Sequence, residues 1–157
     1  EFVRGTPLMV QLMFVYFGLG LFVNLPALTA GIIAVSLNSG AYVAEVIRGG
    51  INSVDDGQRE AAESLGLNKR DRMRFVIMPQ ALKNIWPALG NEFISLIKES
   101  SIVSIIGVTD LIYQLKIVQS DTYRGVAPIV VAMILYFVMT FSLSRLLKFY
   151  ERKFNNG

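Results

Sequence analysis

Two stretches of this 157-residue chain contain no charged side chain, and they restrict the folds that the chain can adopt. The first runs from Gly5 to Ala44 and the second from Gly125 to Ser144. A helix needs about 20 apolar residues to cross a bilayer, so the first stretch is long enough for two crossings and the second for one. Only 17% of the residues are charged, against about a quarter in a typical soluble domain. A soluble all-α fold would therefore have too few charges for its surface.

The most polar segment, Glu60 to Pro79, lies between apolar segments and has the features of a solvent-side loop of a membrane protein. Its first residues, Glu60-Ala61-Ala62-Glu63, are strong helix formers. Gly66 can adopt the left-handed conformation that ends such a helix, and Asn68 can cap a second helix that starts near Lys69. Two short helices around a glycine would form a knob that could fit a cleft on a partner.

The apolar pattern predicts an all-α, polytopic membrane protein made of one domain, residues 1–157, with about four crossings. The polar loop occupies residues 52–74, and Ser100–Val108 is too short to span, so it is expected to form a re-entrant or outer-face turn. The expected crossings are Leu8–Val23, Ala27–Ile47, Phe75–Leu96 and Val126–Leu147.

Lysine and arginine are distributed unevenly between the two sides of this arrangement. One side receives the basic residues from Arg48 to Arg74 and from Arg145 to Lys153, whereas the other receives Lys116 and Arg124. The side richer in lysine and arginine is cytoplasmic by the positive-inside rule. The polar loop and the C-terminus are therefore expected in the cytoplasm.

The sequence excludes several kinds of chemistry for this chain. It has no Cys and no His, which excludes disulfides, thiol nucleophiles, thiolate metal sites and histidine acid–base catalysis. It also has no G-x4-G-K-[ST] phosphate loop, so a different polypeptide must bind ATP if ATP is used. We therefore predict no catalytic residue, no metal and no cofactor in this chain, and no nucleic-acid partner.

The polar loop resembles the EAA loop of permease subunits of ATP-binding-cassette (ABC) importers. The family pattern is E-A-A-x3-G-x9-I-x-L-P, and this chain has Glu60-Ala61-Ala62, Gly66 and Val76-Ile77-Met78-Pro79 at the corresponding positions. Val76 and Met78 are conservative departures from it. In that family the loop is a coupling helix that docks on a separate ATPase subunit. The residues that the resemblance assigns to coupling are Glu60, Ala61, Ala62, Glu63, Ser64, Leu65, Gly66, Leu67 and Pro79.

Three further segments resemble the subfamily that imports polar amino acids, the histidine, arginine and glutamine permeases. They are Arg4-Gly5-Thr6-Pro7 with Gln11, Ala41 to Gly50, and Asn91-Glu92-Phe93. The resemblance covers almost the whole chain. It implies the type I importer bundle in the bacterial inner membrane, surrounded by membrane lipid, and paired with a second permease copy. It also implies ATPase subunits that bind ATP–Mg, and an extracytoplasmic substrate-binding protein. Members of this subfamily usually have one more membrane helix before the position of Glu1.

Glu92 is the strongest candidate for binding the amino-acid substrate. It lies midway along the third expected crossing, where a carboxylate costs roughly 2.5–3.5 kcal/mol on insertion scales. We expect it to bind the α-amino group, the role that the subfamily's Asn-Glu position supports. Ser95 lies on the same helical face as Glu92. Two structural roles are the alternatives to substrate binding: an ion pair of Glu92 with Lys98 or Lys83, or a protonated Glu92 that only packs. The remaining candidates for the pocket are Asn38, Ser39, Tyr42 and Gln11.

The sequence is also compatible with three other functions. A permease of the same fold could carry another solute, such as an ion or a peptide. A membrane-embedded enzyme would act without a separate ATPase, and a simple membrane anchor would have no use for a charge within its third crossing. The sequence does not tell which amino acid is carried or whether the second permease copy is identical.

Overall fold

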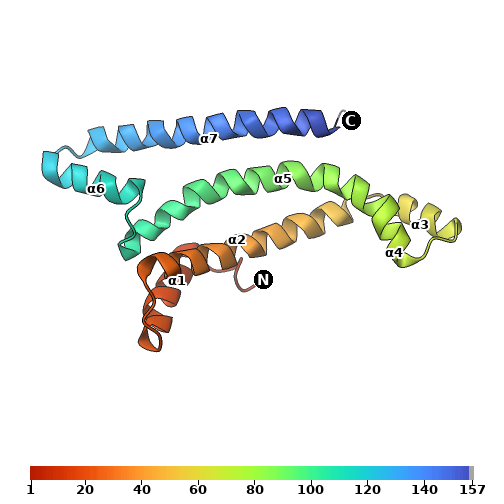
Figure 1. The fold of residues 1–157 in the computed structure, drawn as a ribbon, viewed down its shortest axis with the longest axis horizontal. Helices are drawn as coiled ribbons and strands as arrows, with labels where there is room; N and C mark the ends of the chain where they lie inside the picture. Colours follow the sequence, from red (N-terminus) through yellow and green to blue (C-terminus); the bar gives the residue numbers. More distant parts are fainter. Residues whose placement is uncertain (156–157) are drawn as a thin grey trace. The chain divides into compact units, whose positions relative to one another are not determined.

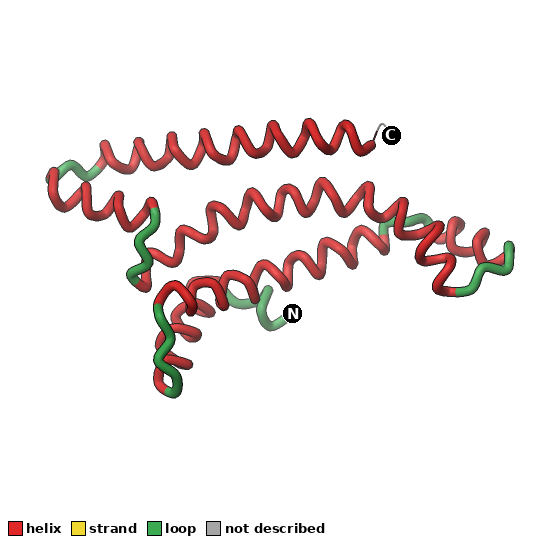
Figure 2. Tube along the Cα trace, viewed as in Figure 1, coloured by secondary structure: helices red, strands yellow, loops and turns green. Residues whose placement is uncertain are grey.

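The computed structural model describes residues 1–155, and the side chains to Glu151. Throughout these residues the regular structure is helical, and Figure 2 shows helices joined by short loops with no strand in the described part. This confirms the predicted all-α class. The α-helices of Figure 1 are α1 (Leu8–Met13), α2 (Ala27–Asn52), α3 (Asp56–Ser64), α4 (Lys69–Asp71), α5 (Met78–Glu99), α6 (Leu111–Thr122) and α7 (Val126–Asn155).

Two of these helices are long and apolar enough to cross a membrane. They are α2 and the part of α7 from Val126 to Glu151. A third span results if the helical run Lys69–Ile106 and α6 are counted as one broken crossing. These lengths and compositions agree with the predicted polytopic membrane protein, but they give two or three crossings where about four were predicted.

The helix at Leu8–Leu21 is shorter than the crossing expected at Leu8–Val23. After α1 the backbone changes to a π-helical turn at Phe14–Gly18 and to a 3₁₀ turn at Leu19–Leu21. At 1.5 Å per residue the whole segment is roughly 20 Å long, whereas the hydrocarbon core is about 30 Å thick. The apolar run in the sequence is therefore longer than the helix that forms within it.

The described chain divides into two compact units. The first consists of residues 1–41 and 93–143, and the second of residues 42–92 and 144–157. The core of the first unit brings Leu12 and Val15 together with Ala30 and Ala34 of α2 and with Ile106. Small residues let membrane helices approach closely, so the alanines of α2 permit this packing.

The connection after α5 is a short 3₁₀ helix followed by a loop, and the re-entrant or outer-face position of Ser100–Val108 stays a prediction. Ser100–Ile106 is a 3₁₀ helix, and Gly107 ends it with a φ of 85°. Glycine adopts this left-handed conformation without the steric cost of a side chain. Asp110 then caps α6, because its Oδ1 accepts a hydrogen bond from the Tyr113 amide at 2.7 Å.

The core of the second unit lies where α2 and α5 approach the polar loop. It consists of Val54 together with Ile77, Ala81 and Ile85. Gly50 makes the close approach possible, since a Cβ at that position would lie 2.2 Å from Cγ1 of Ile85. Real Cβ contacts are not this short, so the glycine is required by packing.

We expect Gly50→Ala to destabilise the protein by about 1–3 kcal/mol, the usual cost of overpacking a well-filled core. The adjacent Gly49→Ala is the matched control, because a Cβ there meets no atom within 4 Å and alanine favours the helix. The thermal unfolding midpoints of the two variants in the same detergent provide the measurement. Equal midpoints would contradict the packing role of Gly50.

Candidate functional site

The loop between α2 and α5 carries its own hydrogen-bonded structure, and we call residues 55–71 the knob. Asp55 caps α3, because its Oδ1 accepts a hydrogen bond from the Gly57 amide at 2.8 Å. At the other end of α3 the Gly66 amide donates to the Glu63 carbonyl at 2.9 Å, and the Leu67 amide donates to the Ala62 carbonyl at 3.1 Å. This pair of bonds is the Schellman motif, which favours glycine in the left-handed conformation. Gly66 has a φ of 77°, which confirms the predicted helix end.

Asn68 caps the second short helix of the knob, as predicted. Its Oδ1 accepts hydrogen bonds from the amides of Arg70 and Asp71, both at 3.0 Å. Its Nδ2 donates to Oδ2 of Asp71 at 2.6 Å. These bonds satisfy two of the amides that the first turn of a helix leaves without a partner.

The surface of the knob exposes most of the residues that the resemblance assigns to coupling. Glu60, Ala61 and Ser64 are exposed, and Leu65 is 82% exposed at the tip. Ala62 is buried beneath them. Glu63 is also exposed, and it forms a salt bridge with Arg72. Glu63 thus joins α3 to the following turn.

Further polar contacts hold the knob against the end of α2 and join that end to α5. Nη2 of Arg59 donates to the Ile51 carbonyl at 2.8 Å, and its Nε lies 3.6 Å from Oδ1 of Asp56. Asn84 of α5 donates to Oγ of Ser53 at 2.8 Å. Sequence reasoning did not identify these residues. The i,i+3 spacing of Asp56 and Arg59 was the one feature of the sequence that indicated a contact here. Because such spacing is common on exposed helices, it did not single these residues out.

Two of the predicted pocket residues meet in the first unit. Nδ2 of Asn38 donates to Oε1 of Gln11 at 3.2 Å, and Asn38 is only 4% exposed. The amide nitrogen of Gln11 lies 2.6 Å from the Val3 carbonyl, 3.0 Å from the Thr6 carbonyl and 2.8 Å from Oγ1 of Thr6. Gln11 and Asn38 together therefore fix the Arg4-to-Pro7 turn against the middle of α2.

We expect Gln11→Leu to release this turn, because it removes all the hydrogen bonds of the Gln11 side chain and leaves the buried amide of Asn38 without that partner. Leaving such a group unsatisfied costs about 1–3 kcal/mol. Hydrogen–deuterium exchange of the purified protein should accelerate at residues 3–6 and stay at the wild-type rate in the knob. Unchanged exchange at residues 3–6 would show that the network does not hold the turn.

The other predicted pocket residues lie on the long helices. Glu92 and Ser95 are half-buried on α5, one turn apart. Ser39 and Tyr42 are one turn apart on α2, and Tyr42 is 40% exposed. Ser39 and Ser95 belong to the first compact unit, as do Gln11 and Asn38. Glu92 and Tyr42 belong to the second unit.

Glu45, also on α2, forms an ion pair within its own helix. Its Oε2 lies 3.8 Å from Nη1 of Arg48, one helical turn further along α2. Both side chains are substantially exposed, so the pair contributes little to stability. Within the described residues, no group of three or more acidic side chains is arranged to hold a metal ion.

Comparison with known proteins gives consistent matches along the chain. The family model described as "Binding-protein-dependent transport system inner membrane component" matches residues 1–156. The putative glutamine transport system permease protein GlnP of Rickettsia bellii (strain RML369-C) is 47% identical over 152 residues, 96% of this chain and 70% of that protein. The arginine transport system permease protein ArtQ of Bacillus subtilis (strain 168) is 44% identical over 156 residues, 98% of this chain and 71% of that protein.

A solved structure is also similar to this chain. It is described as "Crystal structure of an amino acid ABC transporter with histidines". The two chains are 56% identical and superpose with a TM-score of 0.92. The match covers 98% of this chain and 72% of the other.

Proposed function

Because the chain belongs to the family of binding-protein-dependent transport system inner membrane components, the permeases of ABC transporters, we propose that it imports a polar or charged L-amino acid. The observation that carries this proposal is the 56% identity and TM-score of 0.92 to an amino acid ABC transporter. Relatives named for glutamine and for arginine transport support the same substrate class. The chain itself performs no bond chemistry in this proposal.

Coupling to ATP hydrolysis is assigned to the knob. Its capped helices present Glu60, Ala61 and Leu65 to solvent, where a separate ATPase subunit can contact them. The ATPase binds ATP–Mg, closes, and moves the knob together with the attached ends of α2 and α5. The permease then alternates between outward-open and inward-open states by movement of packed helices.

Substrate recognition is assigned to Glu92, whose carboxylate binds the α-ammonium group. Ser95 lies on the same face of α5, one turn away, and completes that part of the pocket. Ser39 and Tyr42 contribute polar groups from α2. The side chains of Gln11 and Asn38 are bonded to each other, so their part in the pocket is to hold its wall in place.

The proposed location is the bacterial inner membrane, with the knob and the C-terminus in the cytoplasm. The basic residues from Arg48 to Arg74 support this orientation through the positive-inside rule. An extracytoplasmic binding protein delivers the amino acid to the opposite side.

Reconstitution tests the proposal. The permease is combined in vesicles with its ATPase and its binding protein, and ATP hydrolysis is measured with each of the twenty amino acids outside. We expect stimulation by one or a few polar or charged amino acids, together with uptake of the same compounds. Hydrolysis that responds to an ion or a peptide but to no amino acid would overturn the substrate assignment.

The permease is proposed to act as a two-fold dimer, which is the commonest assembly of soluble oligomers. Much of α7 is apolar and exposed, including Ile134 and Phe137, so a partner helix could pack there. The chain has no cysteine, so single cysteines from Val126 to Leu147 can be introduced without background. We expect crosslinks between copies that recur every three to four positions. Absence of crosslinks at every position would exclude α7 from the interface.

A further inference from the structure

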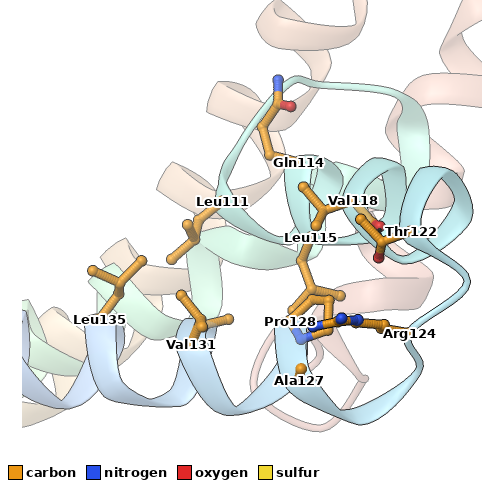
Figure 3. Close-up of a pocket in the computed structure, with 11 residues that line it drawn as sticks. Leu111, Gln114, Leu115, Val118, Thr122, Arg124, Ala127, Pro128, Val131 and Leu135 are labelled. Atoms are coloured by element: carbon orange, nitrogen blue, oxygen red, sulfur yellow. Dashed lines mark hydrogen bonds between the residues drawn. The ribbon is translucent and has the colours of Figure 1, made fainter.

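A groove between α6 and α7 is not used by the proposed transport function. It has a volume of about 340 Å³, within the range of about 300–1,000 Å³ that is usual for sites of small molecules. Its walls are almost wholly apolar, with side chains from both helices (Figure 3). The principal wall residues are Leu111, Leu115 and Val118 of α6, and Val131, Ala132 and Leu135 of α7.

Arg124 places a positive charge at one end of this groove. It lies in the linker between the helices and is exposed, and Figure 3 shows its side chain directed toward Pro128 at the start of α7. Nε2 of Gln119 donates to the Gly125 carbonyl at 2.6 Å and so fixes the linker beside it. A guanidinium group binds phosphate oxygens in a bidentate manner, so this end of the groove suits a phosphate.

The position of the groove along α7 matches one leaflet of a bilayer. The part of α7 that is long and apolar enough to cross a membrane starts at Val126, two residues after Arg124, so a crossing that begins there would put the guanidinium at the depth of the lipid headgroups. Tyr123 beside it is 95% exposed, and tyrosine is enriched at this interface. From Val126 to Leu135 the helix rises roughly 14 Å, close to half the thickness of the hydrocarbon core of about 30 Å.

We propose that the groove binds a phospholipid, with its phosphate on Arg124 and one acyl chain between α6 and α7. The length, the apolar walls and the charge at the interfacial end all correspond to one lipid molecule of one leaflet. Asp121 is also exposed in the last turn of α6, but it does not line the groove. The site therefore combines the apolar groove, which takes an acyl chain, with the guanidinium of Arg124, which binds the phosphodiester.

Native mass spectrometry of the purified transporter complex tests this proposal. The delipidated complex is titrated with dioleoyl phosphatidylglycerol and, separately, with dioleoyl glycerol, which lacks the phosphate. We expect saturable binding of one phosphatidylglycerol per copy of this chain. Arg124→Gln should weaken that binding about tenfold, in line with the loss of a charge-assisted hydrogen bond, and leave the binding of dioleoyl glycerol unchanged.

A pair of neighbouring substitutions tests the groove itself. Val118→Trp fills it, whereas Ile117→Trp places the same side chain outside it, and the two positions are similarly exposed at 45% and 40%. We expect Val118→Trp to abolish saturable lipid binding and Ile117→Trp to retain it. Equal binding by both variants would overturn the proposal. Disulfide formation between two copies through Val118→Cys would also overturn it, because a second permease would then occupy the groove.

Discussion

Replacing Glu92 with glutamine is expected to lower transport and substrate-stimulated ATP hydrolysis by about 10- to 100-fold. The amide keeps the shape of the side chain but loses the charge that, in the proposed site, pairs with the α-ammonium group of the substrate. A hydrogen bond to a charged group contributes about 1.5–3 kcal/mol, and each 1.4 kcal/mol corresponds to about tenfold in binding. Glu92 is half-buried on α5, so its carboxylate is only partly open to water.

The measurement separates binding from folding. The complex containing Glu92→Gln should assemble at wild-type yield and hydrolyse ATP at the basal rate, and only its response to the amino acid should fall. Asp121→Asn is the matched control, because it makes the same carboxylate-to-amide change at an exposed position on α6. Loss of the assembled complex would instead indicate a structural ion pair of Glu92. Wild-type transport would remove Glu92 from the pocket.

Replacing Gly66 with valine is expected to uncouple ATP hydrolysis from transport. Gly66 has a φ of 77°, and a β-branched residue in that conformation costs about 1–3 kcal/mol. The Schellman bonds at the end of α3 would be lost or distorted, and Leu65 and Leu67 would leave their positions on the knob. We expect hydrolysis without uptake, or loss of the ATPase during purification.

Gly66→Asn is the control for this prediction. No atom lies within 4 Å of a Cβ at that position, so the added side chain meets no steric obstacle. Asparagine tolerates the left-handed conformation better than other residues with a Cβ. Gly66→Asn should therefore retain most of the coupled transport. If both variants transported at the wild-type rate, neither the conformation of Gly66 nor the shape of the knob would matter for coupling.

The parts of the knob that were predicted correctly depend on neighbours in the sequence. A glycine that ends a helix and an asparagine that starts one act through hydrogen bonds to residues within five positions, as the bonds of Gly66 and Asn68 show. The salt bridge of Glu63 with Arg72 was not predicted. It depends on how the chain turns between α3 and the π-helical segment, and the charge pattern did not indicate that turn.

The first membrane segment shows a different limit of the sequence. The apolar run from Leu8 to Val23 predicted a single membrane-spanning helix. Hydropathy does not indicate that the helix changes its hydrogen-bonding pattern at Phe14 and ends at Leu21. Gln11 was predicted as a pocket residue from its polarity in an apolar run. The bonds of Gln11 to Val3 and Thr6 depend on the turn before α1, and no pattern in the sequence predicted that turn.

The contacts that brace the knob have a mechanical consequence. Arg59 is tied to the Ile51 carbonyl at the end of α2, and Asn84 of α5 is tied to Ser53, while caps close both short helices. If the knob docks on an ATPase subunit as proposed, these bonds would pass a force applied at Leu65 to the end of α2 and from there to α5, with little bending of the loop. The knob would then work as a stiff lever whose movement is set by the partner that pushes it.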